Sequence, residues 1–315
     1  MSQQGQQDPT RPAGRRWPDV AVVVATRDRP ELLERAVAGI MAQSYPGAVE
    51  CLVVFDQSAR RQVAVAEPAG RRLTVLGNSR APGLAGARNT GMLASRAPLI
   101  AFCDDDDVWT PAKLRSQVEC LESAAAEFAA SGVRIHHADR VMDRIPPPAV
   151  PIGQLVRERV AALHPSTFLF RRDLVDRIGL VDEAIPGGYG EDYDWLLRAA
   201  GRMPVVCVQQ PLADIYWHPQ SYFAERWATV ASALEYLLGK HQVLAADPAG
   251  RARIQGQIAF AQAALARRSA ALRTGSQALR GNPRERRAYL AMAVAAGVLP
   301  ATTVVRLANR RGRGI

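Results

Sequence analysis

The sequence predicts an α/β protein with a mostly parallel β-sheet flanked by helices, followed by an all-helical C-terminal extension. Three observations indicate this class. Short apolar runs typical of buried strands alternate with helix-forming segments in the first third of the chain, an order that favours a parallel sheet. Acidic residues stand directly after two of these runs. Beyond about residue 220 the composition changes to alanine, leucine and arginine, which favour helices.

The chain begins with a polar segment and not with a strand. Residues 1–18 are rich in glutamine, proline, glycine and arginine and contain no apolar run. This composition predicts a disordered lead rather than a signal peptide. We therefore expect the α/β domain to cover residues 19–220 and a basic helical extension to cover residues 221–315.

Within the α/β domain, strands and helices are expected to alternate. Predicted strands cover residues 20–26, 51–56, 73–76 and 99–103. Pro30 opens a segment in which apolar residues recur at helical spacing, a polar helix-like stretch follows Ser58, and a further helix is expected over residues 84–96. This order predicts parallel strands joined by right-handed crossovers.

Two acidic strand ends lie where such sheets bind ligands. Asp56 ends one predicted strand, and another is followed by Asp104, Asp105, Asp106 and Asp107. Ligands of open α/β sheets gather at the carboxyl ends of the strands. Alternate carboxylates there can bind a hydroxyl group and a hard divalent cation that bridges phosphate oxygens. Without this context, four aspartates in a turn would indicate a solvated acidic loop.

Positive charge is concentrated in the extension. The net charge of the chain is +10, yet residues 226–315 hold 15 lysines and arginines against 3 aspartates and glutamates, which leaves a net charge of −2 for residues 1–225. A cationic end attracts anionic membrane surfaces, nucleic acids or acidic partners. A solvated helix face explains the same charge equally well.

The extension is predicted to form several helices and no membrane span. One helical face of its first part carries Phe223, Trp227, Val230, Leu234 and Leu238. A second helix is expected over residues 251–272, and a third begins with Asn282 as its cap and Pro283 in its first turn. The nearest apolar candidate for a span, residues 290–305, is shorter than the ~18–20 residues required and contains Pro300.

The four cysteines indicate buried thiols. Cys51, Cys103, Cys120 and Cys207 lie far apart and lack the spacing of paired metal ligands. Three of them stand in apolar, strand-like runs, where a free thiol behaves as a small apolar side chain. We therefore expect a reducing, cytoplasmic location.

Six stretches of the chain resemble the family 2 glycosyltransferases and follow that family's order. They lie between about residues 20 and 218 and read VVVATRDRPELLERAV, VVFDQS, GLAGARNTGM, IAFCDDDDVWTPAKL, HPSTFLFRRDLVDRIGLVDE and GGYGEDYDWLLRAAG. One such stretch would be a weak indication, whereas six in register are specific. The resemblance implies a Rossmann-like GT-A fold and transfer of a sugar from a nucleotide diphosphate donor with inversion. It also implies a nucleotide-sugar half at about residues 19–110 and an acceptor half at about residues 111–220.

The resemblance places the nucleotide beside residues of the first half. Thr26 and Asp56 match positions at the base and ribose, and Arg88 matches a position that contacts the nucleotide. Arg27 stands where the family usually carries an aromatic residue, so its guanidinium is expected to stack on the base or to bind phosphate. Phe55 and Asp56 stand where the family usually has two acids, so uridine, guanosine and thymidine donors all stay open.

The aspartate run matches the DxD motif of the family. The resemblance implies that Asp104 lies near the ribose, that Asp105 belongs to the nucleotide-sugar-binding set, and that Asp106 binds a divalent metal, Mn²⁺ or Mg²⁺. His218 is a second candidate for the metal, because neutral imidazole is a competent ligand, although a lone histidine is more often structural. His164 is interpreted as structural on the same ground.

Asp192 matches the catalytic base of the family, and Glu191 matches a helper or acceptor-binding group. Asp192 begins the predicted helix EDYDWLLRAAG, so the positive end of the helix dipole favours its charged form. Inversion needs the base opposite the leaving diphosphate and within reach of the attacking hydroxyl. Two acids at a helix start are also explained by dipole complementation without catalysis.

The sequence therefore predicts a metal-dependent inverting glycosyltransferase of cell-envelope polysaccharide, glycolipid or natural-product glycosylation. Its acceptor would be a glycan, a lipid-linked molecule or a small molecule, and its basic C-terminal helices would allow peripheral contact with the inner face of the membrane. The alternative is a module that binds nucleotide sugar without turnover. A nucleic-acid partner is not expected, because the acidic rim repels phosphate and aromatic platforms are missing.

Overall fold

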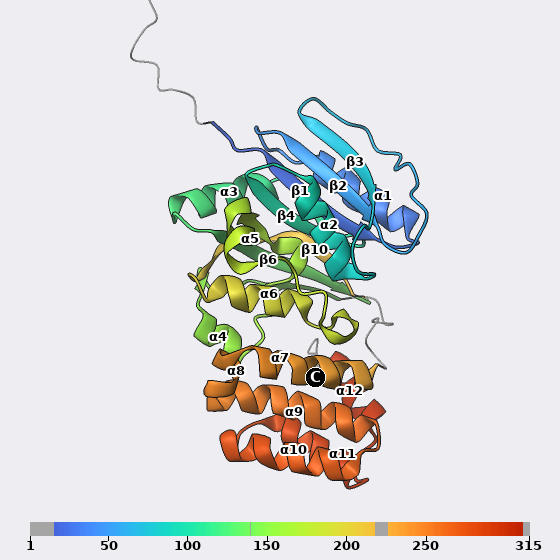
Figure 1. The fold of residues 1–315 in the computed structure, drawn as a ribbon, viewed down its shortest axis with the longest axis vertical. Coiled ribbons are helices and arrows are strands. Elements are labelled where there is room, and N and C mark those ends of the chain that lie inside the picture. The colour runs from blue at the N-terminus through green and yellow to red at the C-terminus, as the bar shows by residue number, and fades with distance from the viewer. Residues whose placement is uncertain (1–15, 139, 218–225, 311–315) are drawn as a thin grey trace, which may run out of the picture.

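The structure, a computed structural model, describes residues 16–138, 140–217 and 226–310. A sheet-containing part lies above a stack of C-terminal helices, and helix α6 (Glu191–Ala200) lies between the two (Figure 1). The predicted class is confirmed, since a mostly parallel sheet is flanked by helices and followed by a helical region.

Within the described residues, one ten-stranded sheet has the strand order β3-β2-β1-β4-β9-β6-β10-β5. Its parallel half consists of β1 (Val20–Thr26), β2 (Val49–Phe55), β3 (Arg71–Gly77) and β4 (Leu99–Asp104). The other half contains β9 (Leu169–Arg171), antiparallel to both neighbours, and the parallel pair β6 (Phe128–His137) and β10 (Val205–Tyr216). The remaining strands are β5 (Val108–Trp109), β7 (Arg140–Arg144) and β8 (Ala149–Val150).

Helices cover both faces of the sheet, which explains why its central strands are apolar throughout. One face packs against α1 (Pro30–Met41) and α3 (Lys113–Ser123). The other face packs against α2 (Leu84–Ala94), α4 (Ile152–Arg157), α5 (Arg172–Ile178) and α6. Side chains of a strand alternate between faces, so Ile100 and Phe102 join the second core while Cys103 joins the first.

An aromatic cluster fixes the start of α6, the helix that carries the predicted base. The ring of Trp195 lies 4.5 Å from that of Phe170 and 5.9 Å from that of Phe102, measured between centroids. Its Nε1 donates a hydrogen bond of 3.0 Å to the carbonyl oxygen of Gly179. Buried aromatic pairs stabilise a contact beyond the burial of their area. The first turn of α6 is therefore held against the sheet.

The C-terminal region consists of six helices within the described residues. They are α7 (Trp227–Lys240), α8 (Gln242–Ala246), α9 (Pro248–Ala264), α10 (Arg268–Gly281), α11 (Arg286–Ala295) and α12 (Ala301–Arg310). Small residues such as Ala252, Ala278 and Ala288 form the contact between these helices and let them pack closely. Val230 and Leu234 of the predicted apolar face are buried, and Phe223 lies outside the described residues.

Three local predictions were wrong. No helix follows Ser58: residues 59–68 have no regular secondary structure, and Val63 and Val65 pack against the core between exposed neighbours. The helix predicted over residues 251–272 is broken between α9 and α10, where Ala266 has a φ of 57°. The third helix is capped by Glu285, whose side chain accepts a hydrogen bond from the backbone of Arg287, and not by Asn282.

The cysteines are free thiols, and Cys51, Cys103 and Cys207 are buried, as predicted, whereas Cys120 is only partly buried. No helix among the described residues has the combined length and apolarity that a bilayer crossing requires.

Candidate functional site

The carboxyl ends of β1, β2 and β4 meet at one edge of the sheet, as parallel pairing requires. In the register of the sheet Thr26 is paired with Phe55, and Ala25 with Asp104. The residues that follow these strands form one wall of a cavity of about 520 Å³, which we call the large cavity. The first wall includes Thr26, Arg27, Asp56, Asp104, Asp105 and Asp106, and the opposite wall includes Asp182, Glu183, Gly187, Gly188 and Glu191.

Asp56 is held by donors from two segments. Its carboxylate accepts hydrogen bonds from Asn78 Nδ2 at 2.8 Å, Gln57 Nε2 at 2.9 Å and the backbone nitrogen of Gly83 at 3.0 Å. Burial acts to raise the pKa of Asp56, but these hydrogen bonds outweigh it and the pKa is lowered. A charged carboxylate therefore lines the large cavity at the end of β2.

Asp105 and Asp106 share the guanidinium of Arg29. Arg29 Nη1 lies 3.3 Å from Asp105 Oδ1 and 2.9 Å from Asp106 Oδ2, and Thr26 Oγ1 donates to Asp105 Oδ2 at 2.7 Å. Burial raises the pKa of Asp105 to about 6. Burial, and then repulsion by Asp104, raise the pKa of Asp106. These carboxylates crowd one wall, where a cation would relieve their repulsion.

Arg88 joins the acidic strand end to the start of α6. Its Nη2 donates to Asp104 Oδ1 at 2.7 Å and its Nη1 to Glu191 Oε1 at 2.9 Å, and the residue is only 2% exposed. Burial opposes the charge of Arg88, but Asp104 and Glu191 outweigh it and raise the pKa of Arg88. Burial raises the pKa of Glu191 to about 8, repulsion from Asp192 adds to the rise, and Arg88 opposes it. The three side chains thus form a buried bridge across the site.

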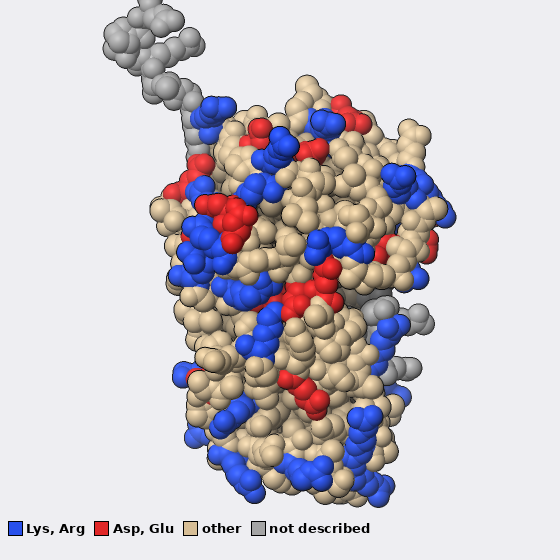
Figure 2. Space-filling view, in the orientation of Figure 1, with Lys and Arg blue, Asp and Glu red and all other residues tan. Residues whose placement is uncertain are grey.

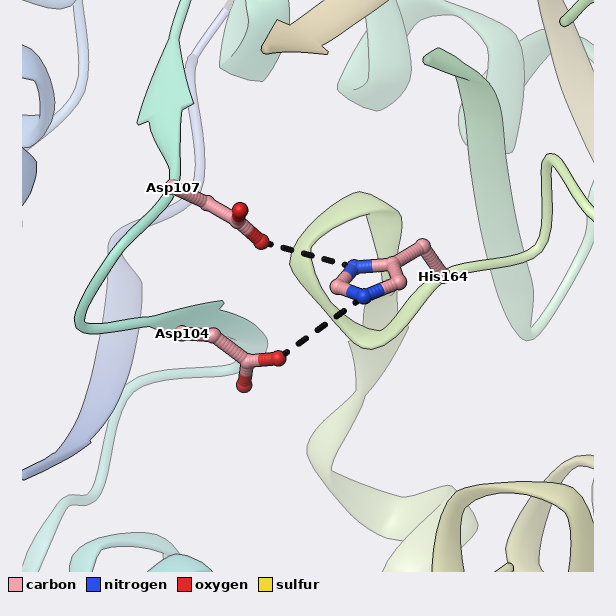
Figure 3. A group of neighbouring side chains, drawn as sticks. All are labelled: Asp104, Asp107 and His164. Carbon is pink, nitrogen blue, oxygen red and sulfur yellow. Dashed lines mark ion pairs between the residues drawn. The ribbon is translucent and has the colours of Figure 1, made fainter. Parts of the chain in front are cut away.

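His164 meets two of the aspartates (Figure 3). Its Nε2 lies 3.9 Å from Asp104 Oδ2 and its Nδ1 lies 3.5 Å from Asp107 Oδ2. One ligand atom from each of the three lies within 4.8 Å of the others, a spacing that could hold a metal ion. Asp107 is buried and accepts a hydrogen bond of 2.5 Å from Ser166 Oγ, and burial raises its pKa well above its usual range.

A second cavity, of about 220 Å³, adjoins the large one. Leu84, Asp104 and Glu191 line both cavities. Asp192 lines the second cavity, where it is the second residue of α6 and its Oδ1 accepts a hydrogen bond of 2.8 Å from the backbone nitrogen of Tyr193. Helices α7 and α9 supply much of the remaining wall. The carboxyl ends of the strands and the start of α6 therefore face one divided cleft.

Helix α7 is tied to both sides of the segment that carries Glu191 and Asp192. Lys240 Nζ lies 2.5 Å from Asp182 Oδ2 and 2.7 Å from Asp194 Oδ1. Tyr236 Oη donates to Asp182 Oδ2 at 2.9 Å, and His241 Nε2 lies 2.8 Å from Asp194 Oδ1. Burial acts to raise the pKa of Asp194, but hydrogen bonds from His241 and Lys240 and the charge of Arg198 lower it. The helical region thus helps to fix the site.

The two signs of charge gather in different places. Figure 2 shows acidic side chains at mid-height, over the junction of the sheet with the helices, and mostly basic side chains over the helices below. The exposed arginines of α9 to α12 and their connections are Arg251, Arg267, Arg268, Arg273, Arg280, Arg284, Arg286 and Arg306. None of these eight forms an ion pair with another residue that the structure describes.

Nine of the ten residues predicted for the site lie in the described part of the chain, and all nine line one of the two cavities. Thr26, Arg27, Asp56, Asp104, Asp105, Asp106 and Glu191 line the large cavity, while Arg88 and Asp192 line the second. His218 lies outside the described residues. Their roles stay predictions, because position alone assigns no chemistry.

Several ionisable residues of the site were not assigned from the sequence, among them Arg29, Asp107, His164, Asp182 and Glu183. Glu183 lines the large cavity and accepts hydrogen bonds from Asn89 Nδ2 at 2.6 Å and from Arg80 Nε. Arg29 follows the first strand by only three residues, and His164 opens the stretch HPSTF. These positions in the sequence could have indicated that Arg29 and His164 belong to the site. Their ion pairs with the aspartates could not be predicted, because the partners lie far apart in the chain.

Comparison with known proteins decides the family. The family model described as glycosyl transferase family 2 matches residues 21–179, which run from β1, without its first residue, to the end of α5 and include the acidic wall of the large cavity. The chain belongs to glycosyltransferase family 2. The resemblance seen in the sequence is thereby confirmed, although Asp192 lies beyond the matched residues.

Individual relatives of this family 2 glycosyltransferase share about 30% identity or less with it over part of its length. The succinoglycan biosynthesis protein ExoO of Rhizobium meliloti (strain 1021) is 31% identical over 228 residues, which are 66% of this chain and 62% of ExoO. The UDP-Glc:α-D-GlcNAc-diphosphoundecaprenol β-1,3-glucosyltransferase WfgD of Escherichia coli is 28% identical over 102 residues, 32% of this chain and 40% of WfgD. The chain therefore spans less than two thirds of the length of either relative.

Solved structures agree on the fold. Residues 1–349 of S. aureus TarS, in complex with UDP, superpose with a TM-score of 0.58 and 15% identity over 94% of this chain and 92% of that one. At this identity the likeness concerns the fold alone. Together with family membership it confirms the predicted GT-A architecture.

Proposed function

We propose that this protein is a metal-dependent enzyme that transfers a sugar from a nucleotide diphosphate sugar to an acceptor hydroxyl with inversion at the anomeric carbon. One observation carries the proposal: two cavities share Asp104 and Glu191, the large one is lined by carboxylates, and the second is lined by Asp192. A donor in the large cavity and an acceptor in the second would meet at the shared wall.

The large cavity suits the nucleotide diphosphate. Asp56 is charged and lies at the end of β2, so it can accept a hydrogen bond from the base or ribose beside Thr26. Arg27 is exposed at the rim, where its guanidinium can stack on a base or bind phosphate. WfgD is named for UDP-Glc and TarS binds UDP, which supports a uridine donor for this chain as well.

The residues present fit a divalent metal. Asp104 and Asp106 line the large cavity, and the charge of Asp104 raises the pKa of Asp106, so the pair gains from a nearby cation. Oxygen donors of this kind suit Mg²⁺ and Mn²⁺, and His164 offers an imidazole nitrogen beside Asp104. We assign the metal to Asp106 with Asp104, and keep His218 as a further candidate. A bound metal would neutralise the diphosphate leaving group.

Asp192 is the proposed base. Its carboxylate takes the proton of the acceptor hydroxyl, the oxygen forms a bond to the anomeric carbon, and the bond from that carbon to the diphosphate breaks. The positive end of the α6 dipole stabilises the charged carboxylate before proton transfer. Glu191 and Arg88 hold the start of α6 at a fixed place relative to Asp104. This arrangement supports a positioning role for both residues.

The relatives support a place in cell-envelope polysaccharide or glycolipid assembly. ExoO is named for succinoglycan biosynthesis, and WfgD for a diphosphoundecaprenol-linked acceptor. An acceptor of that kind lies at a membrane surface. The exposed arginines of the helical region support peripheral contact with an anionic inner membrane face, with the enzyme in the cytoplasm.

A donor screen tests the proposal. Nucleotide sugars with uridine, guanosine and thymidine bases are tested for thermal stabilisation of the protein and for hydrolysis with Mn²⁺, with Mg²⁺ and after chelation. We expect stabilisation and slow hydrolysis with one donor, both lost on chelation. Donor binding without hydrolysis or transfer to any acceptor would indicate a binding module instead, and the absence of donor binding would contradict both.

A further inference from the structure

The second cavity contains two arginines that the proposed reaction does not use. Arg159 follows α4, is exposed at the cavity, and makes no hydrogen bond or ion pair with the described residues. Arg253 of α9 is only 6% exposed and also lines the cavity. Its Nε donates to the carbonyl oxygen of Val156 at 3.1 Å and its Nη2 to Tyr193 Oη at 2.5 Å, and no carboxylate of the described chain pairs with it.

A buried guanidinium without a carboxylate partner is unfavourable, because it loses water and gains no compensating charge. Burial lowers the pKa of Arg253, and the positive charges of Arg287 and Arg159 lower it further, while Tyr193 and the more weakly acting Glu285 oppose this. The two cavity arginines therefore repel one another. Asp104, Glu191 and Asp192 also line this cavity, but none of them forms an ion pair with Arg159 or Arg253, so both guanidinium groups can contact a bound anion.

The remaining wall of this cavity is largely apolar and comes from both parts of the molecule. The α/β part contributes Leu155, Val160, Leu163 and Leu196, and the helical region contributes Leu234, Leu237 and Ile254. Tyr189 and Tyr193 add rings with polar tips. Cationic side chains, apolar walls and the acids Asp104, Glu191 and Asp192 thus line one space.

We propose that the second cavity binds an acceptor that carries a phosphate or diphosphate group, with Arg159 and Arg253 contacting the phosphate oxygens and an acceptor hydroxyl directed at Asp192. Guanidinium groups match phosphate in geometry and bind it with charge-assisted hydrogen bonds. The apolar wall suits a hydrocarbon segment attached to that phosphate. The inference rests on the proposed function, since it assigns the acceptor class of the same site.

Binding of defined probes tests this without turnover. The full chain is saturated with UDP and metal to fill the large cavity. Three probes are then titrated by calorimetry: a sugar diphosphate esterified to decanol, the decyl glycoside of the same sugar, and inorganic diphosphate. We expect the Kd of the decyl diphosphate probe to be about tenfold or more below that of the glycoside, since charge-assisted hydrogen bonds carry the difference.

Two variants and a control locate the anion. Arg159→Ala is expected to raise the Kd of the decyl diphosphate probe about tenfold, and Arg253→Gln to raise it at least as much. Arg251→Ala removes an exposed arginine of the same helix and should leave this Kd unchanged. Arg253→Gln can disturb the packing of the second cavity, so the Kd of Arg159→Ala is the deciding measurement. The affinity of this variant for UDP checks that it is folded.

Equal affinity for the diphosphate probe and the glycoside, or an unchanged Kd in Arg159→Ala, would overturn the inference. Inorganic diphosphate that binds as tightly as the decyl probe supports the anion site and indicates a soluble phosphorylated acceptor. Tighter binding of the decyl probe supports the same site and indicates a lipid-linked one. Transfer to neutral acceptors with no dependence on Arg159 would overturn this inference and leave the proposed function standing. Arg159-dependent binding of the decyl diphosphate probe without any transfer would support this inference and contradict the proposed function.

Discussion

The cleft and the helical region use charge in opposite ways. In the cleft, Arg88 is buried between Asp104 and Glu191, and beside it Asp194 is buried against Arg198, Lys240 and His241. In the helical region, eight exposed arginines have no ion-pair partner in the described chain. Buried charges must be paired to be tolerated, whereas exposed ones interact weakly and are screened by salt. The buried ion pairs at the cleft therefore fix the relative positions of its side chains, whereas the exposed arginines give the helical region a positive electrostatic potential.

This contrast predicts that substitutions in the cleft have large effects and that matched substitutions outside it have small ones. The expected effects below run from the largest to the smallest.

Asp192→Asn should lower transfer by about 10²–10⁴-fold, because it removes the proposed proton acceptor. Donor affinity should stay within about twofold of the parent value, since Asp192 lines the second cavity only. The measurement is initial rate with saturating donor, together with donor titration. Asp173→Asn is the matched control, because Asp173 is also the second residue of a helix and its side chain is 65% exposed. Near-normal transfer by Asp192→Asn would show that another group is the base.

Arg88→Met should destabilise the fold by about 3–5 kcal/mol, because it leaves the buried Glu191 and the partly buried Asp104 without their cation. Denaturant unfolding measures this loss. Arg80→Met is the control, since Arg80 pairs with Glu183 but its side chain is 37% exposed, and should cost about 1 kcal/mol or less. Arg88→Lys keeps the charge and should fall between the two. Equal losses for Arg80→Met and Arg88→Met would mean that burial does not distinguish the two pairs.

Asp194→Asn should destabilise the fold by about 2–4 kcal/mol at pH 7, because it leaves Lys240, His241 and Arg198 around a neutral group. The pKa of Asp194 is lowered in the folded state. A lowered pKa contributes stability above the unfolded value, near 3.9, and that stability is lost as the pH falls through the folded value.

The difference in unfolding free energy between parent and Asp194→Asn should therefore be constant at neutral pH and shrink as the pH falls below about 4. Chemical denaturation at a series of pH values measures it. A difference that does not change with pH would assign the effect to packing and not to charge.

Arg273→Gln combined with Arg280→Gln should leave the unfolding midpoint unchanged, because both side chains are exposed on α10. The same variant should weaken binding to anionic vesicles at low salt, and the loss should diminish as salt is added. Vesicle flotation measures this, with neutral vesicles as the control. Absence of binding by the parent protein at low salt would remove the proposed membrane contact.

Much of the fold follows from local patterns. The apolar runs of β1, β2 and β4, the helix beginning at Pro30 and the acids at the strand ends were all predicted, because strand and helix periods are properties of short segments. The segment after Ser58 was predicted as a helix from its polar composition, but its contacts with the core are made by Val63 and Val65, two residues apart, which is not helical spacing. Antiparallel β9 was not predicted, since its pairing depends on a distant part of the chain.

The sequence by itself therefore determined the fold class, the family and five of the seven carboxylates that line the large cavity, all but Asp182 and Glu183. Only the tertiary structure decided how those charges are paired: Arg88 reaches Glu191 across 103 positions of the chain, and Lys240 reaches Asp182 across 58. It also decided that Arg159 and Arg253 share one cavity. Local spacing fixes the secondary structure of a segment, but the partner of a buried charge is fixed by which distant elements pack against it.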